Sequence, residues 1–178
     1  MTPTEELRHE HKVILLVLEG AEKQVASPGR TDRASLTEMV DFFINFVDRC
    51  HHTKEEKHLF PKLEEHGIPR HGGPIGVMLD EHTQGRSLVA AMKEALSEPQ
   101  GEGDHVPVDA EKNLLRYVEL LRSHIDKENN VLFVMADRAL SAEEQQDLSK
   151  AFVKVEAEEI GEGVHEKYHQ LAHRLAGV

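Results

Sequence analysis

Two pairs of a histidine and a glutamate four residues apart are the first feature of this sequence that could do chemistry. His52 precedes Glu56, and His124 precedes Glu128. On an α-helix this spacing puts both side chains on the same face. An imidazole and a carboxylate on one helix face offer two ligands to a first-row transition metal. Each pair is therefore typical of a helix that binds a metal ion.

Several of the histidines and one of the glutamates interrupt stripes that are otherwise apolar. Apolar residues spaced alternately three and four apart are typical of bundle helices. This pattern continues on both sides of His11, His82, His124 and Glu128. A single histidine in such a stripe is usually a hydrogen-bonded core residue, but an unpaired buried carboxylate is very costly. No lysine or arginine shares the stripe with Glu128, so a metal ion is its expected partner.

Helices must position these side chains, because helical periodicity is strong and strand signals are weak. Long helices are expected over 3–26, 31–65 with a bend at Pro61, 74–97 and 108–138. Short loops are expected to join them, at 27–29, 66–73 and 99–107. A capping box from Ser141 to Glu144 predicts a fifth helix, ended by Gly161 and Gly163, and a last helix is expected over 164–175.

The predicted fold is all-α: an up-down-up-down four-helix bundle with one or two extra C-terminal helices. We expect residues 1–140 to form the bundle and residues 141–178 to form a helical extension packed on it. The second helix is the least regular. His52, Glu56 and Leu59 share one stripe, whereas Phe43 and Phe46 lie on a rotated face, so this helix must be broad or bent.

The antiparallel arrangement brings the candidate ligands to one depth in the bundle. Counted from the predicted loops at about 1.5 Å of rise per residue, their side chains fall within roughly one or two turns of the same layer. The six candidates are His11, His52, Glu56, His82, His124 and Glu128. Histidines placed by chance would have no reason to agree in depth, so the convergence favours a metal site.

The ligand types limit the choice of metal. Six nitrogen and oxygen ligands exceed the four of a tetrahedral zinc site, and the set lacks the thiolates that soft metals and iron–sulfur clusters use. Two carboxylates can bridge two ions that four histidines cap. We therefore expect two non-haem iron ions, in preference to manganese or zinc.

The sequence resembles the hemerythrin-like, or HHE cation-binding, family from Leu7 to about Asp137. Four segments carry the resemblance: 7–11, 51–61, 80–82 and 124–129. The resemblance implies a four-helix bundle with terminal histidine ligands, with Glu56 and Glu128 as bridging carboxylates. It also implies an oxo- or hydroxo-bridged di-iron centre that binds dioxygen or a related small molecule.

The sequence departs from the oxygen-carrying members of that family at one ligand. They have a second histidine four residues after the ligand of the third helix, where this chain has Arg86. Replacement ligands could come from the last helix, in which Tyr168 is expected to face inward: His165, Tyr168 and His169. A solvated helix edge is an equal alternative for the two histidines. Gly85, one turn from His82, could leave a pocket beside the metals, make room for Tyr168, or allow close helix packing.

Four other residues lie next to these candidate ligands in the sequence. Three of them could orient the imidazoles but are expected at the surface: His51, Glu55 and Glu81. Cys50 is expected to be a small packed residue.

Composition narrows the setting and the partners. The 178 residues include 13 histidines and a single cysteine, with a net charge of −12. Strong acidity argues against nucleic acid and anionic membranes as partners, and no apolar run is long enough to span a bilayer. One cysteine and a polar N-terminus point to the cytoplasm. The sequence does not indicate a protein partner.

Three functions fit such a centre. The first is binding of dioxygen or nitric oxide for storage, sensing or scavenging. The second is an enzyme that acts on peroxide or nitric oxide or oxidises iron, because the change to Arg86 could open a coordination position. The third is a structural metal module or an iron sensor that folds around its metal.

Overall fold

The computed structural model describes residues 1–26, 31–97, 106–161 and 163–177, and every regular element in these ranges is a helix. The predicted all-α class is therefore confirmed. The expected loop at 27–29 and most of the loop at 99–107 lie outside the described residues. No helix in the described ranges is long and apolar enough to cross a membrane.

The first and third helices of the bundle are regular. Helix α1 (Pro3–Val25) begins with a capping box in which Thr2 and Glu5 each bond the other's backbone N–H. Helix α4 (Pro74–Ser97) carries the next stripe of buried residues. These bounds agree with the predicted ones within a residue.

The second and fourth helices are long rods that combine α-helical and π-helical stretches. Rod 33–65 consists of α2 (Arg33–Phe42), η1 (Phe43–His52), η2 (Glu55–Leu59) and α3 (Phe60–Glu65). Rod 108–139 consists of α5 (Val108–Lys127), η3 (Glu128–Leu132) and α6 (Phe133–Ala139). The first rod stays helical through Pro61, which lies in the first turn of α3, where a proline is tolerated. Just before it, the N–H of Phe60 bonds the carbonyl of Glu55 in the π-helical pattern.

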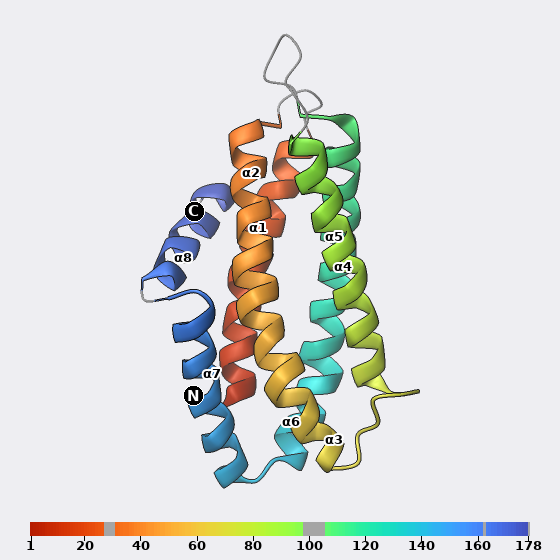
Figure 1. The fold of residues 1–178 in the computed structure, drawn as a ribbon, viewed down its shortest axis with the longest axis vertical. Helices are drawn as coiled ribbons and strands as arrows, with labels where there is room; N and C mark the ends of the chain where they lie inside the picture. The colour runs from red at the N-terminus through yellow and green to blue at the C-terminus, as the bar shows by residue number, and fades with distance from the viewer. Residues whose placement is uncertain (27–30, 98–105, 162, 178) are drawn as a thin grey trace.

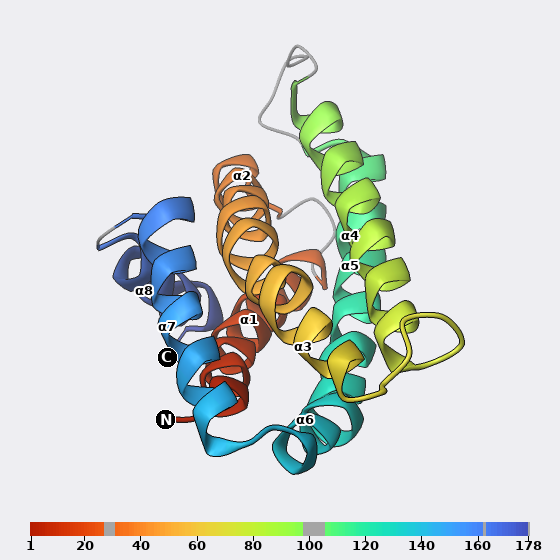
Figure 2. The same ribbon diagram turned by 60° about the horizontal axis from the view of Figure 1, so that its bottom comes forward.

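The four helical rods run in alternating directions, with α4 and α5 side by side (Figure 1). Two more helices, α7 (Ala142–Glu159) and α8 (Val164–Ala176), lie along α1 on the side away from α4 (Figure 2). The capping box at Ser141 opens α7 as predicted. Helix α8 approaches α1 closely at Gly20, where an added Cβ would lie 2.8 Å from Leu175 Cβ.

The apolar core is divided into two clusters by a polar layer. On α1, Leu7 belongs to one cluster and Ile14 to the other, and the buried His11 lies between them. The same order holds on α4 and on both rods, where the buried histidines and glutamates separate the two sets of apolar residues. The bundle therefore presents polar side chains at one common depth, as the sequence predicts.

Candidate metal centre

Among the described residues, seven buried histidine and glutamate side chains from all four helical rods meet at the centre of the polar layer. None of them is more than 4% exposed. They are His11, His51, His52, Glu55, His82, His124 and Glu128.

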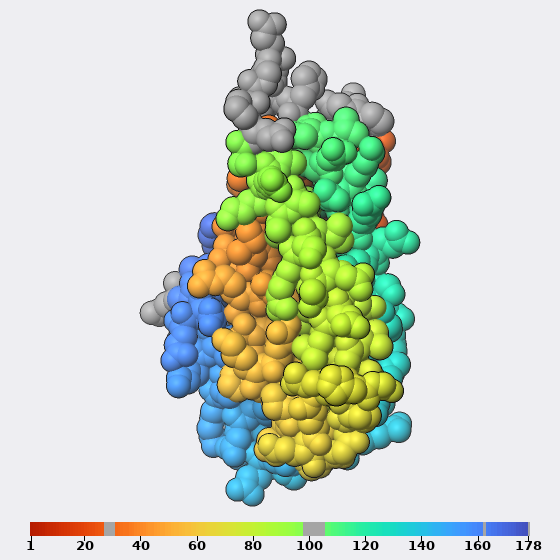
Figure 3. Space-filling view, turned by 45° about the vertical axis from the view of Figure 1, so that its right-hand side comes forward, coloured from red at the N-terminus to blue at the C-terminus, as the bar shows by residue number. Residues whose placement is uncertain are grey.

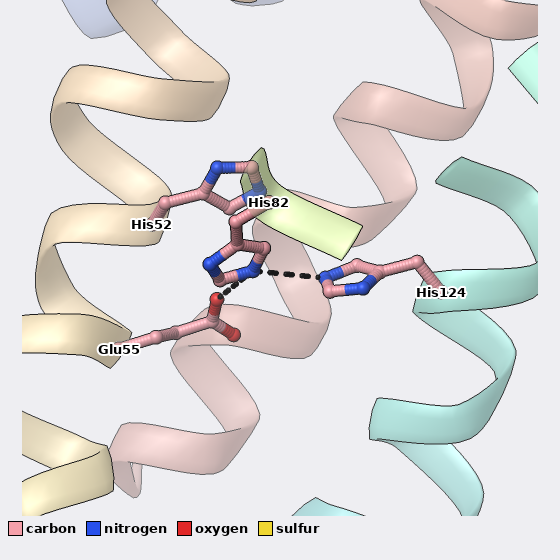
Figure 4. A group of neighbouring side chains, drawn as sticks. All are labelled: His52, Glu55, His82 and His124. Atoms are coloured by element: carbon pink, nitrogen blue, oxygen red, sulfur yellow. Dashed lines mark hydrogen bonds and ion pairs between the residues drawn. The ribbon is translucent and has the colours of Figure 1, made fainter. Parts of the chain in front are cut away.

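These side chains form two adjacent groups. Within each group, the ligand atoms lie within 4.8 Å of one another. The first group is His52, Glu55, His82 and His124, and Figure 4 shows it. The second is His11, His51, Glu55 and Glu128. Within the groups the imidazoles meet through their Nε2 atoms, at 3.1 Å between His82 and His124 and at 3.0 Å between His11 and His51. Each group is thus a small buried cage of nitrogen and oxygen atoms.

Both glutamates lie between the two groups. Glu55 has one oxygen 3.5 Å from His51 Nε2 and the other 3.5 Å from His82 Nε2. Glu128 has one oxygen 3.2 Å from His11 Nε2 and the other 3.3 Å from His124 Nε2. A carboxylate with one oxygen toward each group is placed to bridge two cations.

Each of the five imidazoles also has a polar contact at Nδ1, the ring nitrogen that points away from the centre. Every Nδ1 lies near an oxygen that can accept its proton, so the bare Nε2 faces the centre. The pairs are His11 with Asn129 (2.9 Å), His51 with Glu10 (2.7 Å), His52 with Asp48 (3.4 Å), His82 with Glu56 (2.6 Å) and His124 with Glu81 (2.9 Å). This arrangement fixes the tautomer and the orientation that a metal-binding histidine needs.

Several buried atoms in the centre have no hydrogen-bond partner among the described residues. They include both carboxylate oxygens of Glu55 and of Glu128, and Nε2 of His52. Buried polar groups are normally satisfied, because leaving a carboxylate unpaired in the core is very unfavourable. Cations between the carboxylates and the imidazoles would satisfy all five atoms, so the residues present fit a pair of metal ions.

Charge in the centre supports the same conclusion. Burial and the neighbouring charge of Glu128 raise the pKa of Glu55 well above its usual value. Burial also lowers the pKa of His51 to about 4 and that of His52 well below its usual range, so both imidazoles stay neutral. These two neutral imidazoles are ready to ligate. Two carboxylates in one buried site call for positive charge, and although burial opposes it, Glu128 accordingly raises the pKa of His124 to about 9.

The structure brings together five of the six ligands proposed from the sequence, namely His11, His52, His82, His124 and Glu128. It places Glu56 outside both groups. The Glu56 side chain is 25% exposed, and one of its oxygens accepts from His82 Nδ1 and, at 2.7 Å, from Arg86. Glu55 takes the position between the groups.

The expectation that His51 and Glu55 lie at the surface was wrong, because the rod that carries them is π-helical on both sides of Thr53 and Lys54. In a π-helix the hydrogen bonds join residues five apart instead of four, so the positions that face inward follow a different spacing from those of an α-helix. His51, His52 and Glu55 therefore all point inward. The available signal was the doubled pattern, since His51 and Glu55 have the same spacing as His52 and Glu56.

Other neighbours have clearer positions. Glu81 accepts from His124 Nδ1 and is 14% exposed, so it orients a ligand instead of standing free at the surface. Cys50 is fully buried, and burial raises the pKa of its thiol to about 12. It is a packed residue, as predicted.

The three candidates from the last helix lie outside both groups. Tyr168 faces inward as expected, but its hydroxyl donates to Asp41 at 3.0 Å. His169 stacks on His9. His165 lies near Glu10 and Glu156, and the buried ammonium of Lys54 already bonds both of those carboxylates, so this third cluster has its own cation. The bundle itself supplies five imidazoles to the two groups, without the tail.

Gly85 makes room for a tyrosine, though not for Tyr168. A Cβ at this position would lie 3.3 Å from Tyr117 Cε2 and 3.9 Å from Leu120 Cδ2. A pocket beside His52 also borders Gly85, so both the pocket and the close packing expected from the sequence occur here.

Comparison with known proteins agrees with this geometry. Residues 2–136 match the sequence model of the Hemerythrin HHE cation binding domain. The chain is 27% identical over 169 residues to an uncharacterized protein of Mycobacterium tuberculosis and to one of Mycobacterium bovis. These alignments cover 91% of this chain and 64% of each relative, so the chain spans less than two thirds of the relatives' length. No solved structure matches significantly. The chain belongs to the hemerythrin HHE cation-binding domain family.

Proposed function

We propose that this chain is a non-haem di-iron protein that binds dioxygen, nitric oxide or a related small molecule. The observation that carries the proposal is the position of Glu55 and Glu128, each with one oxygen toward either group of imidazoles. Shared carboxylates are what a pair of cations at short separation requires, because they offset the charge of both ions at once.

The donor set supports iron. Five imidazoles and two carboxylates are nitrogen and oxygen ligands of intermediate softness, and neither group contains a thiolate. Zinc in a structural site usually takes four ligands. One group alone would provide four, so a zinc ion there would not need a carboxylate that is shared with the other group. When bound, a pair of iron ions would supply reversible one-electron chemistry toward small oxygen- or nitrogen-containing ligands.

The two groups are unequal, and this favours ligand binding at one of them. The first group contains three imidazoles and the second contains two, His11 and His51. An ion in the second group would have fewer protein ligands and more room for an added molecule. The protein's part is to hold the imidazoles by their Nδ1 atoms and to exclude bulk water, since all seven side chains are buried.

Arg86 does not leave the centre short of a histidine. Its guanidinium bonds Asp48 and Glu56 at 2.7 Å each, and these carboxylates are the Nδ1 partners of His52 and His82. Arg86 therefore balances the charge of the residues behind the ligands. Since five imidazoles are present without it, the change to Arg86 does not by itself open a coordination position, and we favour binding over turnover.

The test is metal analysis and absorption spectroscopy of the full chain produced in iron-replete cells. We expect two irons per chain and bands typical of an oxo-bridged pair, with a spectral change when the reduced protein meets dioxygen or nitric oxide. Less than one iron per chain, or no change with either gas, would contradict the proposal. Steady-state consumption of peroxide that is lost in Glu55→Ala would instead identify an enzyme.

A further inference from the structure

A pocket of about 180 Å³ lies between η1, α4 and α5. It belongs to the side of the molecule where α4 meets rod 33–65, and Figure 3 shows these two elements next to each other. It begins beside the ring of His52 and runs away from the metal centre toward the end of the bundle where α2 begins. Its lining includes Phe43, His52, Gly85, Val89, Lys93 and Tyr117. The exposed Arg86, Ala90 and Lys93 show that the pocket opens to solvent along α4.

The size of the pocket points to an organic molecule. A cavity of about 150 Å³ engineered into another protein holds one benzene molecule. A diatomic gas would leave most of this pocket empty, whereas one six-membered ring with a small substituent would fill it. The void is therefore far larger than the proposed function needs.

The walls are shaped for an apolar ring. Phe43, Ile44 and Val89 give aromatic and aliphatic surface, and the ring of Tyr117 packs 4.5 Å from that of Phe43. Gly85 lets Tyr117 stand against α4, because a Cβ there would lie 3.3 Å from the tyrosine ring. Such walls favour a flat apolar ligand.

Two polar groups of the pocket remain unpaired within the described part of the chain. Tyr117 is 2% exposed, and its hydroxyl makes no hydrogen bond to a described residue. Lys93 makes no ion pair with one either. The other two charged residues of the lining are already paired, since Arg86 Nε donates to Asp48 at 2.7 Å and the same guanidinium bonds Glu56. The pocket thus offers one free O–H donor, from a tyrosine whose ring is buried, and at its exposed side the Lys93 ammonium, which pairs with no carboxylate among the described residues.

We propose that this pocket binds a small aromatic acid, a single ring that carries one carboxylate. The ring lies among Phe43, Val89 and Tyr117, Lys93 balances the carboxylate charge, and the Tyr117 hydroxyl donates to an oxygen of the ligand. A bound acid would rest against His52, so it would cover one side of the metal centre. The proposal depends only on the pocket of the chain and not on which metal the centre holds.

The experiment is a ¹⁵N NMR titration of the full chain, loaded with diamagnetic zinc, with benzoate and with its neutral isostere benzamide. We expect saturable shifts of backbone amides in 43–52 and 85–93 with benzoate, and about two- to fivefold weaker binding of benzamide. Tyr117→Phe should weaken benzoate binding about fivefold through loss of one hydrogen bond. Lys93→Met should remove the preference for benzoate, while Lys12→Met, an exposed lysine outside the pocket, should leave it unchanged.

Two variants locate the site. Gly85→Leu fills the pocket from α4, and Ala90→Leu narrows its exposed side with little risk to the fold; each should abolish the benzoate shifts. Equal binding of both probes, shifts that fall elsewhere, or binding that survives both variants would overturn the proposal. These outcomes are independent of the response of the iron form to gases, so a failure here leaves the proposed di-iron function standing, and the reverse also holds.

Discussion

Lys54 and Glu10 form an ion pair inside the protein, with Nζ 2.6 Å from one carboxylate oxygen. The other oxygen of Glu10 accepts from Nδ1 of His51 at 2.7 Å. Glu6 and Glu156 lie 2.7 Å from the same ammonium, and Lys54 is fully buried. Burial alone would lower the pKa of Lys54, but Glu10 and the other acidic neighbours outweigh it and raise the pKa. Because Glu156 belongs to α7, one lysine connects the C-terminal extension to a proposed metal ligand.

Replacing Lys54 by methionine should destabilise the protein strongly. The change leaves three carboxylates without their cation, and Glu10 is only 2% exposed. Removing one partner of a buried ion pair typically costs about 3–5 kcal/mol. Urea denaturation of the full chain measures the effect. The matched control is Lys57→Met, since Lys57 is 64% exposed and its nearest acidic partner lies 3.7 Å away; we expect a change below about 1 kcal/mol. Equal effects of the two substitutions would contradict the role of Lys54.

Glu55 and Glu56 are adjacent in sequence, yet their replacement by glutamine should have different consequences. Glu55→Gln removes a carboxylate from between the two groups of imidazoles, so the chain should lose at least one bound ion. Glu56→Gln changes only the partner of His82 Nδ1, so two ions should remain with affinity lowered about 10–100-fold. Metal analysis after dialysis and a competition titration with a chelator measure both. If Glu56→Gln loses the ion and Glu55→Gln keeps it, the assignment is reversed.

How far the sequence could predict the centre depended on helix type. On α1, α4 and α5 the 3.6-residue period holds through the polar layer, so His11, His82 and His124 lie where their stripes put them. On rod 33–65 the π-helical stretches change that period, and an α-helical count selects Glu56 where Glu55 points inward. The sequence already shows this change of period, because the apolar stripe of this helix is irregular and could be explained only by a broad or bent helix.

The tail was predictable in outline but not in its contacts. Capping residues and glycines gave the limits of α7 and α8, because those signals are local. The partner of Tyr168 is Asp41, and Glu156 meets Lys54; the residues of each pair are more than a hundred positions apart in the sequence. Such pairs follow from how the helices pack, which no local pattern encodes. The division into a bundle and an extension at residue 140 stays a prediction.

The cap of α7 should weaken in acid. Glu144 accepts hydrogen bonds from the Ser141 backbone N–H and from His66, and these lower the pKa of its carboxyl from 4.5 to about 2. A lowered pKa in the folded state means that the stabilisation is complete above pH 4.5 and is lost as the pH falls toward 2. Glu144→Gln should therefore be less stable than the natural chain at pH 7, and the gap should close between pH 4.5 and 2. Denaturation of the metal-free chain at several pH values measures it, and a gap independent of pH would rule the ion out as its source.

Metal removal should lower the melting temperature of the chain. Without cations the carboxylates of Glu55 and Glu128 share a buried site and have no hydrogen-bond partner in the described part of the chain. An ion that binds only the folded state stabilises that state. A free metal concentration about a thousandfold above Kd gives roughly 4 kcal/mol, or about 8–16 °C for a chain of this length. Circular dichroism melting of chelated and metal-reloaded protein measures the shift. In the double variant Glu55→Gln with Glu128→Gln the shift should largely disappear, because neutral amides neither repel each other nor bridge cations. An identical melting temperature with and without metal in the natural chain would mean that the buried carboxylates are satisfied some other way.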